Sequence, residues 1–220
     1  MKQLLTVIIM GLITQTSMAQ NKKDWANFAK YETANTHEEE GQVVFMGNSI
    51  TEGWARWRPD FFKANKYIGR GIGGQTSAQM LARFPNDVVA LKPRAVVISA
   101  GTNDIAQNQG YISLEDILKN IQGMAELARS NNIKVYLTSV LPAYAFDWRP
   151  AIKDAADQII KLNSMIRAYA EKEGFDYVDY HSSLKDDRNG LPEKFAKDGV
   201  HPTGPAYEIM EEVLQAKLKK

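Results

Sequence analysis

Three side chains in this sequence have the types and spacing needed for nucleophilic attack on a carbonyl carbon. Ser49 follows a short apolar run at residues 43–46, and a serine hydroxyl needs an adjacent base to attack near neutral pH. His201 can be that base, because Asp198 lies three residues before it and can hold the second ring nitrogen. Taken alone, each has a simpler interpretation: Ser49 as a helix N-cap, and Asp198 as a capping residue beside a surface histidine.

The attack would place negative charge on the carbonyl oxygen, which must be met by hydrogen-bond donors. Gly74 offers an unobstructed backbone amide, and Asn103 offers a side-chain amide. Both follow apolar segments that resemble strands. The alternatives are a plain turn glycine and an asparagine that ends a strand in an Asx-turn.

The chain has three histidines, so the choice of base is limited. His37 precedes a run of three glutamates and is expected in a solvated turn. His181 directly follows the fifth predicted strand and is the serious competitor. His201 is favoured because Asp198, three residues before it, can hold its second nitrogen and fix its tautomer.

Neither a cofactor nor a metal is expected. Residues 69–74 match G-x-G-x-x-G, but they follow the second predicted strand, and residues 92–94 about 20 positions later are Lys-Pro-Arg. The dinucleotide fingerprint needs the first strand and an acidic residue there. The chain has no cysteine, and no histidine and carboxylate cluster has convincing metal spacing. Asp104 is expected to cap the turn that follows it.

Apolar runs and helical periodicity alternate along the chain. Strands are predicted at residues 43–46, 67–68, 94–100, 133–140 and 175–180, and helices at 77–84, 114–129, 152–173 and in the last fifteen or so residues. This alternation predicts an α/β fold, a three-layer α/β/α sandwich with a five-stranded parallel sheet. Since the carboxyl ends of parallel strands share one edge, the polar segments that follow them can meet there.

The motifs G-N-S, G-G, G-T-N-D and D-x-x-H, in this order, resemble those of the SGNH hydrolases, also called the GDSL esterase/lipase family. The segments GIGGQT and GTND are most similar to those of the platelet-activating-factor-acetylhydrolase-like branch. The resemblance implies a flavodoxin-like fold and ester hydrolysis. It implies that Ser49 is the nucleophile, that Asp198 and His201 complete a triad, and that Gly74 and Asn103 join the Ser49 amide in an oxyanion hole.

The sequence departs from the family at Asn48, where the family name has aspartate. This position is not one of the named catalytic groups, so we expect activity to survive the change. Its effect on local hydrogen bonding does not follow from the sequence.

We expect a serine esterase that forms an acyl-enzyme, acting on a small acyl group such as acetyl on a carbohydrate. Aromatic and basic residues near the predicted site could contact the substrate: Trp54, Tyr144, Trp148 and Arg149. Each has ordinary core or rim packing as its alternative. The competing functions are a lysophospholipase or lipid acylhydrolase, and a non-catalytic carbohydrate-binding protein, against which the complete set of catalytic residues argues.

Residues 1–19 have the features of a secretory signal peptide, and residues 20–220 are expected to form a single domain. Lys2 precedes an apolar stretch at residues 4–12, and residues 17–19 have the small-x-small pattern of a cleavage site. We therefore expect a periplasmic or secreted protein without integral membrane association. With 27 basic and 26 acidic side chains, nothing indicates a nucleic-acid partner. The expected partner is a small-molecule or oligosaccharide ester, and the oligomeric state is left open.

Overall fold

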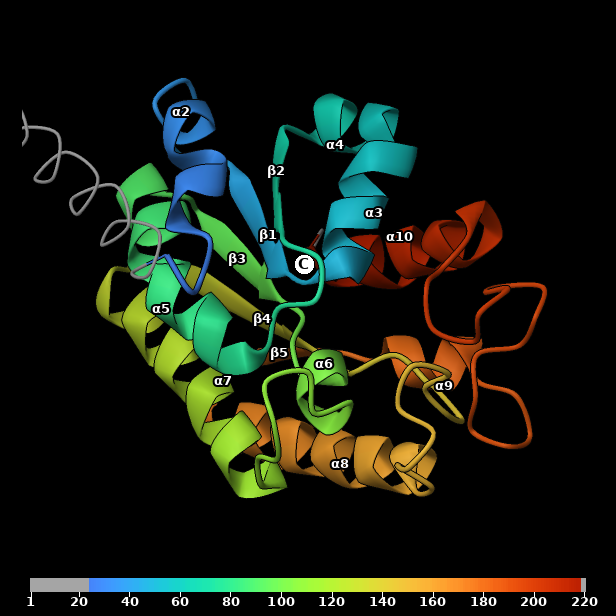
Figure 1. The fold of residues 1–220 in the computed structure, drawn as a ribbon. Coiled ribbons are helices and arrows are strands. Elements are labelled where there is room, and N and C mark those ends of the chain that lie inside the picture. The colour runs from blue at the N-terminus through green and yellow to red at the C-terminus, as the bar shows by residue number, and fades with distance from the viewer. Residues whose placement is uncertain (1–23, 219–220) are drawn as a thin grey trace, which may run out of the picture.

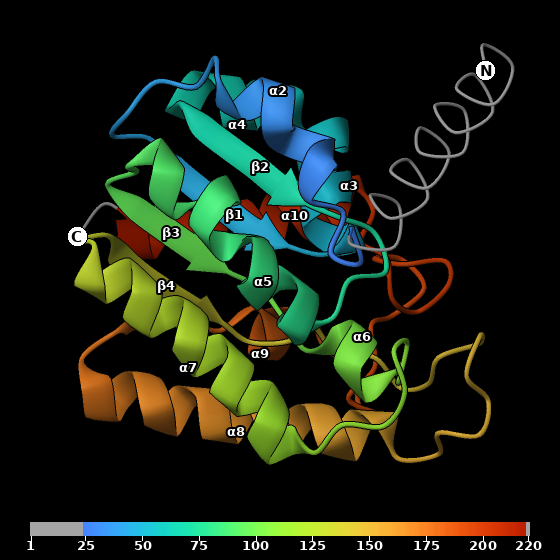
Figure 2. The same ribbon diagram turned by 60° about the vertical axis from the view of Figure 1, so that its left-hand side comes forward.

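A computed structural model describes residues 24–218, and its centre is a five-stranded parallel sheet between two layers of helices (Figures 1 and 2). The strands are β1 (Val43–Gly47), β2 (Tyr67–Gly71), β3 (Ala95–Ile98), β4 (Lys134–Thr138) and β5 (Asp176–Val178). Their order is β2-β1-β3-β4-β5, and every neighbouring pair is parallel. The predicted three-layer fold and its flavodoxin-like strand order are confirmed. The predicted signal peptide lies outside the described residues.

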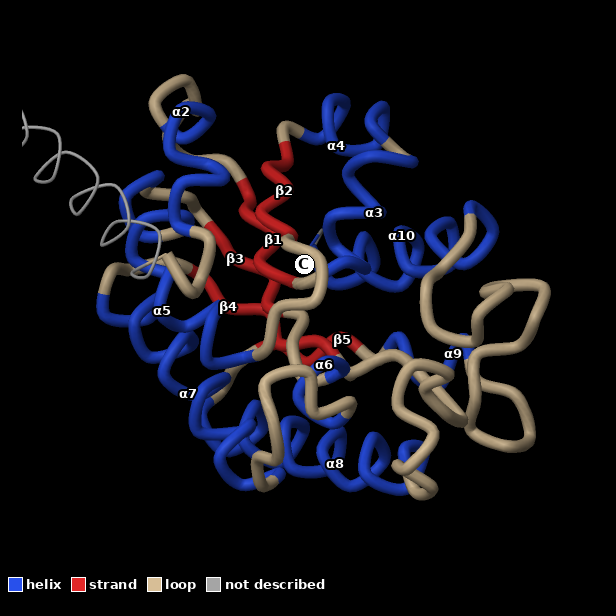
Figure 3. The backbone as a smooth tube through the Cα atoms, viewed as in Figure 1, coloured by secondary structure: helices blue, strands red, loops and turns tan. Residues whose placement is uncertain are grey.

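Helices precede the first strand, connect successive strands and follow the last strand, and Figure 3 colours helix, strand and loop separately. In chain order they are η1 (Phe28–Tyr31), α2 (Glu32–Asn35), α3 (Ser49–Trp57), α4 (Pro59–Asn65), α5 (Ser77–Asp87), η2 (Val89–Leu91), α6 (Thr102–Ile105), α7 (Leu114–Ser130), α8 (Ala155–Glu173), α9 (Tyr180–Leu184) and α10 (Gly204–Leu218). Among these described helices, none is both long and apolar enough to span a bilayer.

Each face of the sheet has its own apolar core, because successive side chains of a strand point to opposite faces. In β1, Val44 and Met46 pack in the cluster formed with α5, α7 and α8. Val43 and Phe45 pack in the second cluster, with α3, α4, α9 and α10. All four are at most 1% exposed, so an unbroken apolar run is what a strand buried on both faces requires.

Most predicted boundaries differ from the observed ones by one to three residues, as two examples show. The strand predicted at 175–180 ends at Val178, because the Asp179 side chain accepts a hydrogen bond from the Ser182 amide and caps α9. The helix predicted at 77–84 continues to Asp87 with Pro85 inside it.

The carboxyl end of β1 is packed so closely that it requires glycine. A Cβ on Gly47 would lie 2.0 Å from Thr51 Oγ1 and 3.3 Å from the Ser99 carbonyl oxygen. Asn48 and Ser49 follow at once, so the close packing fixes where the chain leaves the sheet. The loops after β2 and β3 leave from the same edge.

Candidate active site

Ser49, His201 and Asp198 form a continuous chain of hydrogen bonds at the carboxyl edge of the sheet. The Ser49 Oγ lies 3.0 Å from Nε2 of His201, and Nδ1 of the same ring lies 2.6 Å from Asp198 Oδ2. Ser49 is the first residue of α3, whereas the other two lie in the loop before α10. This is the geometry in which an imidazole can take a proton from a hydroxyl while a carboxylate holds its other nitrogen.

A tight turn holds the carboxylate of Asp198 against the imidazole. Its Oδ1 accepts the backbone amides of Val200 at 3.0 Å and His201 at 2.8 Å, leaving Oδ2 for the ring. Burial raises the pKa of Asp198, but the hydrogen bonds from His201 and Val200 outweigh it, so the pKa lies below its ordinary value. The carboxylate therefore stays charged at neutral pH, as an orienting group must.

Asn48 fixes the start of the helix that carries Ser49. Its side-chain Oδ1 accepts a hydrogen bond from the Ile50 amide at 2.9 Å, and the residue is only 3% exposed. This is an N-cap, which the amide oxygen of asparagine provides as well as a carboxylate does. The departure from the family aspartate therefore leaves the cap in place.

Three groups that could meet an oxyanion lie at this edge of the sheet. In the described part of the chain, the backbone amides of Ser49 and Gly74 donate to no protein acceptor. The side-chain Nδ2 of Asn103 gives one hydrogen to the Gln75 carbonyl oxygen at 2.9 Å, which leaves its second hydrogen available. Asn108 donates to Asn103 Oδ1 at 3.0 Å and so sets the orientation of that amide.

Gly74 has φ +75°, a conformation that strains any residue with a side chain. A Cβ built on it would meet nothing within 4 Å. Glycine is therefore required here by the backbone conformation and not by crowding.

Asp104 caps a helix elsewhere in the chain and not the turn that was expected. Its carboxylate accepts the Ser77 amide at 2.9 and 3.0 Å and the Ser77 hydroxyl at 2.6 Å, so it holds the first turn of α5 and not the turn that follows it. Burial raises its pKa. Across residues 24–218, no three His, Asp or Glu side chains gather in a way that could hold a metal ion.

The other two histidines do not reach the serine. His181 is buried at 8% exposure, and its Nε2 has no partner in the described structure. Burial lowers the pKa of its imidazole, and the Lys185 ammonium lowers it further. The ring of His37 is exposed and lies against the Thr33 carbonyl. Of the three, the structure brings only His201 to Ser49.

Trp54, expected to contact the substrate, is instead a core residue. It is 1% exposed and lies parallel to the rings of Phe61 and Tyr207, with centroids 5.8 and 5.7 Å away. Its indole N–H donates to Glu211 Oε1 at 3.1 Å. The prediction was wrong because α3 turns this residue away from the edge that holds Ser49.

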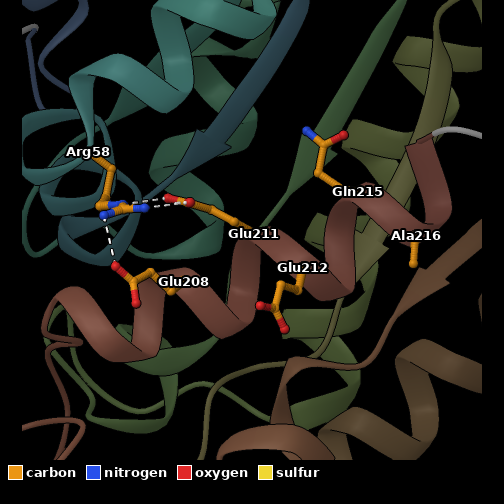
Figure 4. A pocket seen from close by; sticks show the side chains of 6 residues that line it. All are labelled: Arg58, Glu208, Glu211, Glu212, Gln215 and Ala216. Carbon is orange, nitrogen blue, oxygen red and sulfur yellow. Dashed lines mark hydrogen bonds and ion pairs between the residues drawn. The ribbon is translucent and has the colours of Figure 1, made fainter.

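Glu211 on α10, which accepts the hydrogen bond from the Trp54 indole, is also bound by Arg58, as Figure 4 shows. Arg58 donates to both carboxylate oxygens of Glu211 at 2.9 Å and to Glu208 at 3.1 Å. These residues line an open pocket of about 540 Å³. Because the carboxylates are occupied by the guanidinium, this group fastens the end of α3 to α10.

Trp148 lies beside His201, the candidate base. Its ring centroid is 6.4 Å from that of His201, and 39% of the residue is exposed. Its indole N–H donates to Asn108 Oδ1 at 3.1 Å. Asn108, which sequence reasoning missed, therefore joins this indole to Asn103, and it also donates to the Gly74 carbonyl at 3.4 Å.

The other two substrate-binding candidates have different surroundings. Arg149 donates through Nε to the Ala106 carbonyl at 3.2 Å, which ties its loop to the segment after α6. Tyr144 is 56% exposed, and the guanidinium of Arg188 lies over its ring at 5.2 Å. In the described structure, neither side chain has a hydrogen bond to Ser49, His201 or Asp198.

Known proteins of similar sequence share this fold. A profile of the GDSL-like lipase/acylhydrolase family matches residues 45–209. The crystal structure of a GDSL-like lipase from Bacteroides thetaiotaomicron is 50% identical, with a TM-score of 0.86 over 88% of this chain and 98% of that chain.

Two curated proteins are similar in sequence. An acetylxylan esterase of Xylanibacter ruminicola is 27% identical over 213 residues, or 81% of this chain and 43% of that protein. Esterase TesA of Pseudomonas aeruginosa is 30% identical over 99 residues, or 43% of this chain and 48% of that protein. The chain thus matches less than half the length of either relative. The family match alone spans most of the described residues, and the chain belongs to the GDSL-like lipase/acylhydrolase family.

Proposed function

We propose that this protein is a serine esterase that hydrolyses a carboxylic ester through an acyl-enzyme. The observation that carries the proposal is the unbroken contact from Ser49 Oγ through the His201 imidazole to the Asp198 carboxylate. Family membership supports the same reaction class.

In the first half of the reaction, Ser49 Oγ attacks the ester carbonyl carbon while His201 Nε2 takes the hydroxyl proton. The carbonyl oxygen becomes an oxyanion, which the Ser49 and Gly74 amides and Asn103 Nδ2 stabilise. Each such donor is worth roughly 10²–10³ in rate. The bond from the carbonyl carbon to the alcohol oxygen then breaks, and the alcohol leaves with the proton from His201.

In the second half, water replaces the alcohol. His201 takes a proton from the water, whose oxygen attacks the acyl carbon through a second oxyanion. The bond to Ser49 Oγ breaks, the serine recovers its proton, and the carboxylic acid is released. The charged Asp198 holds the ring in one tautomer throughout and stabilises the imidazolium.

The substrate we propose is an acetyl ester on a carbohydrate. The imidazole must protonate the leaving oxygen, so the alcohol part of the ester lies beside His201 and therefore beside Trp148. A half-exposed indole held by a hydrogen bond gives a fixed apolar surface against which a sugar ring can pack. The acetylxylan esterase relative supports this choice. We also propose that residues 1–19 direct export.

The test compares two substrate classes with one matched control. We expect the protein to release acetate from acetylated xylo-oligosaccharides, and Ser49→Ala to remain folded and release none. A lysophospholipase would instead release fatty acid from lysophosphatidylcholine in preference to acetate. Tight oligosaccharide binding with no turnover in either assay would identify a non-catalytic carbohydrate-binding protein and contradict the proposal.

A further inference from the structure

The loop that carries Gly74 is bound directly by the helix that carries Ser49. Glu52 lies one helical turn after Ser49 on α3, and its Oε2 accepts a hydrogen bond from the Gly73 amide at 2.8 Å. A Cβ on Gly73 would lie 3.1 Å from that oxygen and 3.9 Å from Ser49 Cβ. The carboxylate, the loop and the nucleophile therefore meet around one point.

This contact fixes the loop but places a negative charge close to the region where the proposed reaction forms another. Two like charges a few ångströms apart in a partly buried site repel strongly enough to slow the reaction. A carboxylate is therefore a costly choice of acceptor beside an oxyanion hole, unless a cation cancels its charge.

Lys30 supplies that cation from a segment far away in sequence. Its ammonium pairs with Oε1 of Glu52, the oxygen that does not contact Gly73. The side chains are 27% and 37% exposed, so solvent screens the pair only in part. Lys30 Nζ also lies 3.4 Å from the Gly71 carbonyl oxygen.

The segment that carries Lys30 is held against the same loop and the start of α5. The Tyr31 hydroxyl donates to the Gly71 carbonyl. Side-chain amides reach back to the segment: Gln75 donates to the Ala26 carbonyl at 2.6 Å, and Gln79 to the Trp25 carbonyl at 2.7 Å. Figure 2 shows this stretch running past the end of β2 beside α5. Lys30 is thus held in place by contacts other than its ion pair.

We propose that Glu52 is a positioning residue that holds the Gly73–Gly74 backbone in the geometry of the oxyanion hole, and that Lys30 cancels its charge so that the developing oxyanion is not opposed. The inference rests on the proposed esterase function. It assigns a role in the reaction to a residue that precedes the first strand of the sheet.

Two variants of Glu52 separate the hydrogen bond from the charge. Glu52→Gln and Glu52→Ala both remove the charge, but only glutamine keeps an acceptor for the Gly73 amide. With p-nitrophenyl acetate, we expect kcat of Glu52→Ala to be about 10-fold below that of Glu52→Gln, since small displacements of catalytic groups are costly. KM should stay unchanged, because the oxyanion exists only in the transition state.

The role of Lys30 is tested by rescue. Lys30→Met should lower kcat about fivefold at unchanged KM, the effect of one uncancelled charge several ångströms away. Adding Glu52→Gln should return kcat to within about twofold of the wild-type value, because the double variant has no charge left to oppose the oxyanion. Lys92→Met is the matched control, since Lys92 pairs with Glu40 near the amino ends of the strands, away from Ser49. The kcat of this variant should equal that of the wild type.

Equal kcat for Glu52→Ala and Glu52→Gln would overturn the positioning role. A double variant no faster than Lys30→Met would show that the lysine is only an anchor and overturn the charge-cancelling role. Either result, obtained with an inactive Ser49→Ala, leaves the esterase function standing. Wild-type turnover by Ser49→Ala would instead refute the assignment of Ser49 as the nucleophile, and absence of turnover by the wild type would refute the esterase function itself. Thermal melting of every variant checks that the fold is intact.

Discussion

The imidazole of His201 has a different partner on each of its two nitrogens, and this division decides what the side chain can do. Asp198 Oδ2 lies against Nδ1 and Ser49 Oγ against Nε2. A charged carboxylate can only accept, so Nδ1 carries the hydrogen and Nε2 is left as the base. The low pKa of Asp198 keeps this assignment fixed over the neutral range.

Asp198→Asn tests this assignment at the residue scale. Asparagine keeps the shape of the side chain but can present an N–H to the ring, which favours the wrong tautomer. We expect kcat for p-nitrophenyl acetate to fall by about 10⁴, the loss known for the corresponding change in serine proteases. Unchanged thermal melting would show that the fold is retained. A loss of less than tenfold would mean that the carboxylate does not orient the base.

Residue types and order predicted which side chains would gather here, but not how they are supported. Ser49, Asp198 and His201 were found because few residue types can act as nucleophile, base and orienting acid. The indole of Trp54 was placed at the site from proximity in sequence, and burial against α10 shows otherwise. No sequence signal marked Asn108, since a lone asparagine in a polar loop is typical of turns.

Among the elements, α3 links the central sheet to the candidate catalytic residues. It begins at Ser49, directly after the cap residue Asn48, and one turn later it presents Glu52 to the loop after β2. Its second turn buries Trp54 in the core. A single short helix thus places the proposed nucleophile, supports the neighbouring loop and packs against the sheet, so its first turn should be sensitive to substitution.

Asn48→Ala and Asn48→Asp form a matched pair at the element scale. Alanine removes the acceptor of the Ile50 amide, which should cost about 1 kcal/mol of unfolding free energy. For a chain of this size this corresponds to roughly 2–4 °C in Tm. Aspartate keeps an acceptor and should recover most of the loss. Urea and thermal melts measure both; identical melting of the alanine variant and the wild type would contradict the cap.

The strands were predictable because their composition reflects burial on both faces, which a short apolar run records directly. The end of β5 was not, since it depends on one side chain reaching a particular amide, as Asp179 does. The contact of Lys30 with Glu52 could not be predicted from the sequence for the same reason. It joins residues 22 positions apart that the fold brings together, and no motif marks it.

On the scale of the whole molecule, the buried His181 links stability to pH. It lies at the carboxyl edge of the sheet, with its amide donating to Ser139 Oγ at 2.9 Å and its Nε2 unpartnered among the described residues. Because its pKa is lowered in the folded state, the unfolded chain binds the proton more readily. Protonation therefore favours unfolding.

The sign of the effect follows from linkage. Above the unfolded-state pKa of about 6.5 the imidazole is neutral in both states, and its contribution to stability is fully present. As pH falls from there toward the lower folded-state pKa, that contribution is lost. We expect His181→Leu to lose less unfolding free energy than the wild type between pH 7.5 and pH 5, as measured by urea denaturation.

The wild type, denatured in the same urea series, is the reference for the pH dependence. His181→Leu should also keep its esterase turnover at pH 7.5, because the base is assigned to His201. A parallel pH dependence in His181→Leu and wild type would show that the buried imidazole does not contribute.

The turn that joins Asp198 to His201 has one further consequence. The proposed base His201 and the carboxylate of Asp198 lie on a single four-residue piece of backbone, whereas the Ser49 hydroxyl belongs to a separate helix. Any rigid shift of that piece alters one separation, from imidazole to hydroxyl, and leaves the proton on the same ring nitrogen. In a variant where this piece shifts as a rigid body, the tautomer of His201 is therefore kept, and only the position of the imidazole relative to the Ser49 hydroxyl has to be restored.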